Sequence, residues 1–192
     1  MAIRKILTYG TPSLREKSKE VHKVSKKIKE LVNDLLDTLY SQNGVGLAAS
    51  QIGENYRVFV VDTASGDEPL NPMIFINPKI IKKSGAFISH EGCLSFPEVY
   101  ADVRRYSYVM IKAMDENGRS FVMEGKEGSL LAKALQHEFD HLEGILFIDH
   151  VRNRFEIEQE LAKMHLPPLE LDKMLAEPEL EEAIKTSLVK EK

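Results

Sequence analysis

Residues 136–144 read Gln-His-Glu-Phe-Asp-His-Leu-Glu-Gly, at the end of a stretch from Ser129 to Glu143 without proline or glycine. Such a stretch predicts one helix, and residues four apart lie on one face of a helix. His137 and His141 therefore point the same way, and two imidazoles at this spacing can bind one divalent metal ion. Glu138 stands beside them, where a carboxylate can exchange a proton with a water at the metal. The run predicts a hydrolytic metal site on a helix.

Tight turns join short apolar segments ahead of this helix, which predicts antiparallel strands. Asp115-Glu116-Asn117-Gly118 is typical of a hairpin turn. The absence of alternating strands and helices argues against a doubly wound parallel sheet. We therefore expect an α+β fold, with antiparallel β-sheets wrapped around a central metal-binding helix. The expected strands are 57–61, 73–76, a pair within 79–90 around Ser84-Gly85, parts of 99–113, and 120–124.

Two further helices are expected on either side of these segments. Apolar residues with a period of 3.6 predict an N-terminal helix from Ser25 that ends at Asn43-Gly44. Residues 154–164 are expected to be helical, and two short acidic helices are expected after Pro167-Pro168. The length favours one domain. We expect a catalytic domain over residues 1–165, with residues 166–192 as a helical C-terminal extension of the same domain.

Composition restricts the class of protein further. A hydrophobic share of 43% can fill a globular core, and no apolar run approaches the roughly 20 residues that span a bilayer. Residues 1–10 lack the apolar core of a secretion signal. The single cysteine, Cys93, excludes an intrachain disulfide and favours a reducing compartment. The expectation is a cytoplasmic protein that does not interact with a membrane.

A catalytic metal site needs a third protein ligand and an open position for water. Cys93, His90, His150 and an acidic residue are the alternatives in this sequence. Cys93 follows Gly92, a residue that would let the backbone approach a metal, and its thiolate suits borderline divalent ions. The competing interpretation is that a lone cysteine is a small buried hydrophobe.

Two glycines alternate with apolar residues in Gly44-Val45-Gly46-Leu47-Ala48-Ala49-Ser50-Gln51. The pattern is typical of a strand edge that another backbone approaches, and an extended peptide could pair there. Gln51 could donate its amide N–H to a developing oxyanion. The missing Lys-Ser/Thr ending excludes a phosphate-binding loop, while an ordinary loop-to-helix turn remains the alternative.

Three segments, in this order, resemble the signature of the peptide deformylase family. The family shows Gly-x-Gly-Leu-Ala-Ala-x-Gln, Glu-Gly-Cys-Leu-Ser and Gln-His-Glu-x-Asp-His, and its opening is similar to Tyr9–Arg15. The resemblance covers roughly residues 3–150, and two departures from it are Ser50, where the family usually has proline, and Tyr100, where many members have arginine. The matching segments are Gly44–Gln51, Glu91–Ser95 and Gln136–His141.

This resemblance implies a role for each matching residue. It implies Cys93, His137 and His141 as metal ligands, Glu138 as general base and acid, and Gln51 with the backbone N–H of Leu94 as oxyanion donors. It also implies that Gly44, Val45 and Gly46 bind the substrate peptide as an added strand. Helical spacing places Leu130 and Ala134 on the face of His137 and His141, where they could line a slot for a methionine side chain. The alternative is that Leu130 and Ala134 only fill the core.

The implied activity is co-translational removal of the N-formyl group from the initiator methionine of new proteins, releasing formate. The implied cofactor is one divalent metal ion, Fe2+ in the cell, with Zn2+, Ni2+ or Co2+ as alternatives. The expected partners are N-formylmethionyl nascent peptides and the ribosome near its exit tunnel, but neither DNA nor a membrane. Residues 1–30 carry nine Lys or Arg against three Glu, so Lys17, Lys19 and Lys23 are expected to contribute to ribosome docking.

Two other functions compete with this interpretation. A zinc endopeptidase uses the same helix pattern, but with His or Glu as third ligand. A non-catalytic zinc-stabilised binding protein would close the site with a fourth protein ligand. Glu91 is expected to pair with Arg105 and to orient the cysteine segment. Surface or structural roles are expected for His22, His90, His150 and His165.

Overall fold

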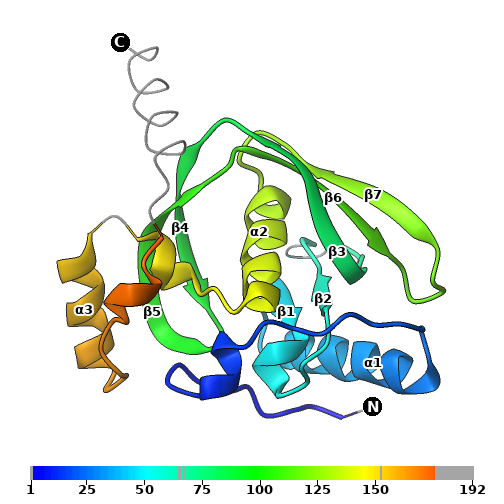
Figure 1. Cartoon of the computed structure of the whole chain (residues 1–192), viewed down its shortest axis with the longest axis horizontal. Coiled ribbons are helices and arrows are strands. Elements are labelled where there is room, and N and C mark those ends of the chain that lie inside the picture. Colours follow the sequence, from blue (N-terminus) through cyan, green and yellow to red (C-terminus); the bar gives the residue numbers. More distant parts are fainter. Residues whose placement is uncertain (1, 65, 67, 152, 176–192) are drawn as a thin grey trace.

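Helix α2 (Leu130–Glu143) lies between two antiparallel sheets in the computed structural model, which describes residues 2–64, 66, 68–151 and 153–175 (Figure 1). The larger sheet has the strand order β1-β2-β3-β6-β7, and the smaller one is the hairpin of β4 and β5. Each pairing between these strands is antiparallel, as expected. The strands are β1 (Gly46–Ala48), β2 (Val58–Val61), β3 (Met73–Ser84), β4 (Phe87–Cys93), β5 (Phe96–Arg105), β6 (Tyr108–Met114) and β7 (Ser120–Gly125).

Helix α2 begins and ends where its sequence predicts. The Ser129 hydroxyl accepts a hydrogen bond from the Ala132 N–H, which satisfies one of the free donors of the first turn. Gly144 ends the helix with a φ of 73°, and a side chain there would collide with the backbone of Arg15. The metal-binding motif is therefore held on a helix with defined ends.

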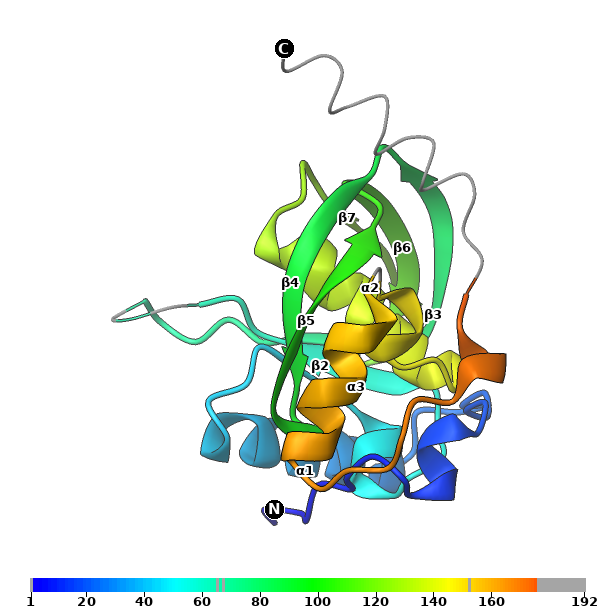
Figure 2. The same ribbon diagram turned by 90° about the vertical axis from the view of Figure 1, so that its left-hand side faces the viewer.

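Two other helices cover the outer faces of the sheets. Helix α1 (Lys26–Ser41) buries its expected apolar stripe, including Leu35 and Leu39, against β1, β2 and β3. Helix α3 (Arg154–Lys163) packs against β5 through Ile157 and Leu161 (Figure 2). Short 3-10 helices complete the fold: η1 (Pro12–Arg15), η2 (Ala49–Ile52), η3 (Phe147–His150) and η4 (Leu171–Lys173).

The strand pair expected within residues 79–90 is wrong, although both strands exist. Strand β3 runs on to Ser84 and pairs with β6, whereas β4 pairs with β5. Gly85 has a φ of 64° and redirects the chain from one sheet into the other. As a result β3 pairs with β6 and β4 pairs with β5, and both partners are longer than a strand of a hairpin within residues 79–90 could be. The hairpin expected at Asp115–Gly118 is confirmed, because β6 pairs with β7.

The described part of the C-terminal segment lies against the domain. Leu169 is buried, the Tyr9 hydroxyl donates to the Pro168 carbonyl at 3.0 Å, and the Leu175 N–H donates to the Asp149 carbonyl at 3.0 Å. Of the two acidic helices expected here, residues 165–175 contain only the short turn η4, and residues 176–192 lie outside the described part. In the described ranges, no helix has the length and apolar character to cross a bilayer.

Candidate metal centre

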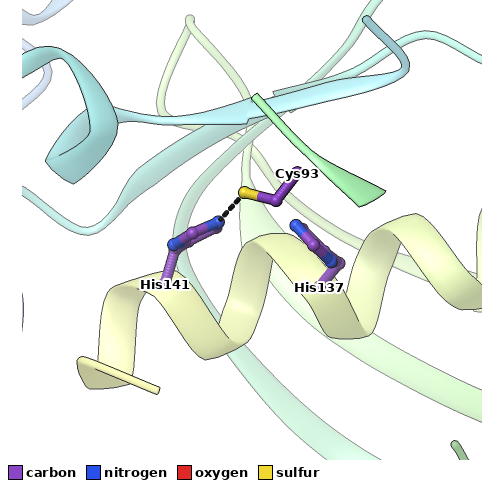
Figure 3. A group of neighbouring side chains, drawn as sticks. All are labelled: Cys93, His137 and His141. Carbon is purple, nitrogen blue, oxygen red and sulfur yellow. Dashed lines mark hydrogen bonds between the residues drawn. The ribbon is translucent and has the colours of Figure 1, made fainter. Parts of the chain in front are cut away.

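Cys93, His137 and His141 converge from two elements that are far apart in the sequence. Both histidines stand on α2, and Cys93 is the last residue of β4 (Figure 3). The Cys93 Sγ lies 3.3 Å from the His141 Nε2, and the three potential ligand atoms all lie within 4.8 Å of one another. A thiolate and two imidazoles at these separations fit around one divalent ion.

A tight turn brings Cys93 to the helix. Cys93 pairs with Phe96 across Leu94 and Ser95, and the register shifts between Gly92 and Cys93. A Cβ at Gly92 would lie 2.6 Å from the Tyr100 ring, so a side chain here would displace that ring. Gly92 therefore leaves room for the Tyr100 ring, and its expected role in letting the backbone approach a metal stays a prediction.

Gln51 reaches the same point from the turn after β1. Its Oε1 accepts from the Ala48 N–H at 2.8 Å, which fixes the orientation of the amide group. Its Nε2 therefore points towards the Cys93 Sγ at 3.4 Å and the Ser95 Oγ at 3.2 Å. The side chain is buried and presents an N–H beside the metal-binding group.

Glu138 lies buried between α2 and β1. A Cβ at Gly46 would stand 2.5 Å from the Glu138 Oε1, so only glycine leaves room for this carboxylate. The Glu138 Oε2 is buried and has no hydrogen-bond partner among the described residues. Burial raises the pKa of Glu138 to about 7, because the ionised form loses its hydration. A carboxyl with such a pKa can both take up and release a proton near neutral pH.

A buried ionic network holds the first of the two histidines. The Arg105 guanidinium donates to both oxygens of Glu91, at 2.9 and 2.8 Å, and to Asp140. Glu91 Oε2 also lies 3.1 Å from the His137 Nδ1. This contact leaves the His137 Nε2 for a metal, which is how a carboxylate orients a metal-binding imidazole. Burial alone would raise the pKa of Glu91, but the charge of Arg105 holds it well below its usual value.

The expected pairing of Glu91 with Arg105 is confirmed, whereas the involvement of Asp140 and His150 was missed. The Asp140 Oδ2 lies 2.9 Å from the His150 Nε2. His150, one of the alternatives for the third ligand, therefore contacts this network through Asp140, and the group of potential metal ligands consists of Cys93 with the two motif histidines. His90, another alternative, is exposed and bonds to Asp102 through its Nδ1 at 2.8 Å.

The two departures from the deformylase pattern also have defined places. The Ser50 hydroxyl is buried and donates to the His141 carbonyl at 3.3 Å, which joins η2 to the motif helix. Tyr100 is 58% exposed and its ring stacks on His90 with the ring centroids 5.9 Å apart. Ser50 therefore contacts the backbone of a metal-binding residue, while Tyr100 lies at the rim of the site.

A cavity of about 540 Å³ opens next to the ligand group. Every residue expected at the site lines this cavity except His141, which is buried. Among the described residues, only three side chains form the metal-binding group, so no fourth protein ligand closes it. An open position is the mark of a catalytic site, not of a structural one. The expected residues that line the cavity are Gly44, Val45, Gly46, Gln51, Cys93, Leu94, Leu130, Ala134, His137 and Glu138.

The fold and the site together define a metal-dependent hydrolase with an α+β architecture. Its motif helix supplies two histidines and a glutamate, and a hairpin supplies a cysteine. Comparison with known proteins gives the particular family: the model of the polypeptide deformylase family matches residues 3–156. The chain belongs to the peptide deformylase family.

Individual relatives agree with this assignment. Peptide deformylase 1 of Clostridium perfringens is 46% identical over 150 residues, which cover 78% of this chain and 99% of that protein. The peptide deformylase of Clostridium botulinum is 44% identical over 154 residues, covering 80% of this chain and all of the relative.

Solved structures agree as well. The peptide deformylase of Synechococcus elongatus, in complex with actinonin, is 36% identical with a TM-score of 0.83, covering 91% of this chain and 92% of that one. The peptide deformylase of Thermotoga maritima is 34% identical with a TM-score of 0.73, and the match covers 80% of this chain and 100% of that one.

Family membership confirms the expected enzyme class and activity. Peptide deformylases are metal-dependent hydrolases that remove the N-formyl group from formyl-methionyl nascent peptides. The match to this family decides against the zinc endopeptidase and the non-catalytic zinc protein. The Cys-His-His group in the chain accords with metal dependence.

Substitution of a metal ligand should lower metal affinity, and the chain offers a control. Replacing Cys93 with alanine removes one of three ligands, so we expect at least a hundredfold weaker Co2+ binding and loss of thiolate-to-cobalt absorption. His90→Ala removes an exposed histidine from the same hairpin and should leave the binding unchanged. Competition with a chromophoric chelator measures both, and equal affinities of the two variants would contradict the assignment of Cys93.

Proposed function

We propose that Cys93, His137 and His141 hold one metal ion and that Glu138 performs the proton transfers of deformylation. The observation that carries this proposal is the buried Glu138 carboxylate, whose Oε2 is unpartnered among the described residues and which lines the same cavity as Cys93 and His137. A bound divalent ion supplies Lewis acidity, which lowers the pKa of water and polarises a carbonyl.

Glu138 takes the proton from the attacking water and holds it on its carboxylate. It then gives this proton to the amine nitrogen of methionine when the bond to the formyl carbon breaks. A pKa of about 7 suits both steps, because neither form of the carboxyl is strongly favoured. Formate and a free amino terminus are the products.

Gln51 and the backbone N–H of Leu94 stabilise the negative charge that develops on the formyl oxygen. The bond from the Ala48 N–H to the Gln51 Oε1 supports this role, since it directs the amide N–H into the site before substrate binds. Leu94 lies in the turn after Cys93 and lines the same cavity. Donors that are oriented in advance need no reorganisation during the reaction.

The substrate peptide pairs with the segment of Gly44, Val45 and Gly46 as an added strand. In the described sheet, β1 has β2 as its only neighbour, which leaves its other edge free at the cavity. Leu130 and Ala134 form the slot for the methionine side chain. Ala134 supports this assignment because its side chain stands one turn before His137 and occupies little volume.

Iron(II) is the metal that we propose for the cell, with Zn2+, Ni2+ or Co2+ able to replace it. The donor set supports this group of ions, because one thiolate and two imidazoles bind all four. The nascent peptide substrates further suggest a cytoplasmic enzyme that works at the ribosome, near the exit tunnel. The single cysteine agrees with a reducing compartment.

We also propose that residues 1–165 and the extension from residue 166 form one domain. The buried Leu169 and the bond from Tyr9 to the Pro168 carbonyl support this for the described residues. Because the family model ends at residue 156, the extension is a feature in addition to the catalytic part.

Formate release from a formyl-Met-Ala-Ser peptide tests the proposal as a whole. The metal-loaded chain should release formate, and a chelator should abolish the reaction. Protein reloaded with Fe2+ under anaerobic conditions should be the most active of the four metal forms. Glu138→Gln should bind the metal normally and lose nearly all activity. Normal turnover by this variant would remove Glu138 from the mechanism.

Removal of the Gln51 amide should slow the chemical step. Loss of one oxyanion donor costs about 2.7–4 kcal/mol of barrier, so kcat of Gln51→Ala should fall by roughly two to three orders of magnitude. Metal content and melting temperature should stay unchanged. The control Gln159→Ala alters an exposed glutamine on α3 and should keep full activity. Normal kcat together with weakened metal binding would show that Gln51 only supports the Cys93 thiolate.

Filling the proposed slot should weaken substrate binding. Ala134→Phe places a large ring next to His137, so KM for formyl-methionyl peptides should rise at least tenfold, while metal content is preserved. Ala162→Phe adds the same ring at an exposed position of α3 and should have no effect. An unchanged KM for Ala134→Phe would place the methionine pocket elsewhere.

A further inference from the structure

A second cavity, of about 770 Å³, lies on another face of the molecule from the metal centre. The two cavities share no lining residue. From α2 the second cavity is lined by Phe139 and Glu143, each two positions after a metal-binding histidine. Two positions correspond to about 200° around a helix. We call this cavity the basic groove, because five cationic side chains line it: Lys17, Arg57, Lys79, Lys82 and Lys83.

The groove is positively charged in a protein that is negatively charged overall. Two carboxylates, Glu20 and Glu143, also line it, which leaves a local charge of +3 against a net charge of −4 for the chain. Glu143 is occupied by Arg57 and Lys17, each at 2.6 Å, and Glu20 lies 3.7 Å from Lys79. The acidic groups in the groove are therefore already paired and leave an excess of cations.

Lys82 and Lys83 contribute most of this excess. Among the described residues, neither forms an ion pair with a carboxylate; instead Lys82 lies over the Tyr108 ring at 5.5 Å and Lys83 over the Tyr106 ring at 4.4 Å. Shifts of register between Ile76 and Lys79 and between Ile80 and Lys82 interrupt the alternation of β3. Lys82 and Lys83 follow the second shift in regular register with Met110 and Val109 of β6, and both are exposed and line the groove.

We propose that the basic groove binds the phosphate backbone of double-stranded RNA. Lysine ammonium groups bind phosphates as point charges without reading bases. Phe139, the one aromatic side chain among the described residues that line the groove, has the Arg57 guanidinium over its ring at 5.5 Å from the centroid, so a cation already occupies one face on which a base could stack. Single-stranded RNA is usually held by such stacking, so the groove suits a duplex backbone better.

The choice of RNA over an acidic protein rests on the proposed function, since nascent peptides are presented by a particle rich in RNA duplexes. Docking through this face would also leave the metal cavity open to a peptide, because the two cavities have separate linings. The C-terminal residues 151–192 carry seven Lys or Arg against ten Asp or Glu and lack the charge for this task.

Reversal of the strand charges tests the proposal. The probe is a 20-base-pair RNA duplex of arbitrary sequence, titrated with the metal-loaded full chain at several salt concentrations. The variant combines Lys79→Glu, Lys82→Glu and Lys83→Glu, and leaves Lys17 and Arg57 with their partner Glu143. The control combines Lys26→Glu, Lys126→Glu and Lys163→Glu, which are exposed elsewhere and change the net charge equally.

The wild-type protein should bind the duplex with an affinity that falls steeply with salt, by about 0.9 in log K per log salt unit for each phosphate contacted. The groove variant should lose at least tenfold in affinity and about two to three units of this slope. The control variant should lose much less affinity for the duplex. Both variants should release formate from a free formyl tripeptide at the wild-type rate, so failure of docking is distinguishable from failure of the catalytic assignment.

Three results would overturn the proposal. The first is absence of wild-type binding to the duplex, and the second is an equal loss in the two triple variants, which would reflect net charge alone. The third is tighter binding of polyglutamate than of RNA, lost in the groove variant, which would assign the groove to an acidic protein. Intact ribosomes, compared in the same assay, should follow the order seen with the duplex.

Discussion

The buried guanidinium of Arg105 connects the two halves of the active site. It bonds to Glu91 of the hairpin and Asp140 of the motif helix, and it is only 2% exposed. Removing one partner from such a network typically costs about 3–5 kcal/mol, because a charge is left buried and unpaired. The same Glu91 orients His137, and Cys93 stands two residues later on β4. The position of the sulfur relative to the imidazoles therefore depends on this arginine.

Glycine is required at two positions around the metal centre because a side chain there would collide with a neighbouring residue, more than because of backbone flexibility. Gly46 leaves space for the Glu138 carboxylate, and Gly92 leaves space for the Tyr100 ring. A methyl group at Gly46 would displace the Glu138 carboxylate, and one at Gly92 would displace the Tyr100 ring at the rim of the site. Cys93, the histidine pair, the Glu138 carboxylate and the Gln51 amide thus come together because three separate segments approach one another closely.

The parts of this structure that depend on local spacing could be predicted from the sequence, and the parts that depend on distant pairing could not. The motif helix, its two histidines and Glu138 follow from a period of 3.6 residues, which needs no tertiary information. Cys93, His90 and His150 could not be separated as third ligands without the family resemblance, because the register of β4 and the tertiary placement of η3 decide which of them reaches the histidine pair. The contact of Asp140 with His150 and the pairing of β3 with β6 were missed because both depend on how elements that are separate along the chain pack together.

Strand β1 has a further consequence, given the proposed pairing of substrate along its free edge. A polypeptide can align there only if its first residues are extended and unpaired. An amino terminus that has already entered a helix or the interior of its own domain presents no such strand. Deformylation would then be confined to the interval before the new protein folds, and late substrates would escape it even with the formyl group intact.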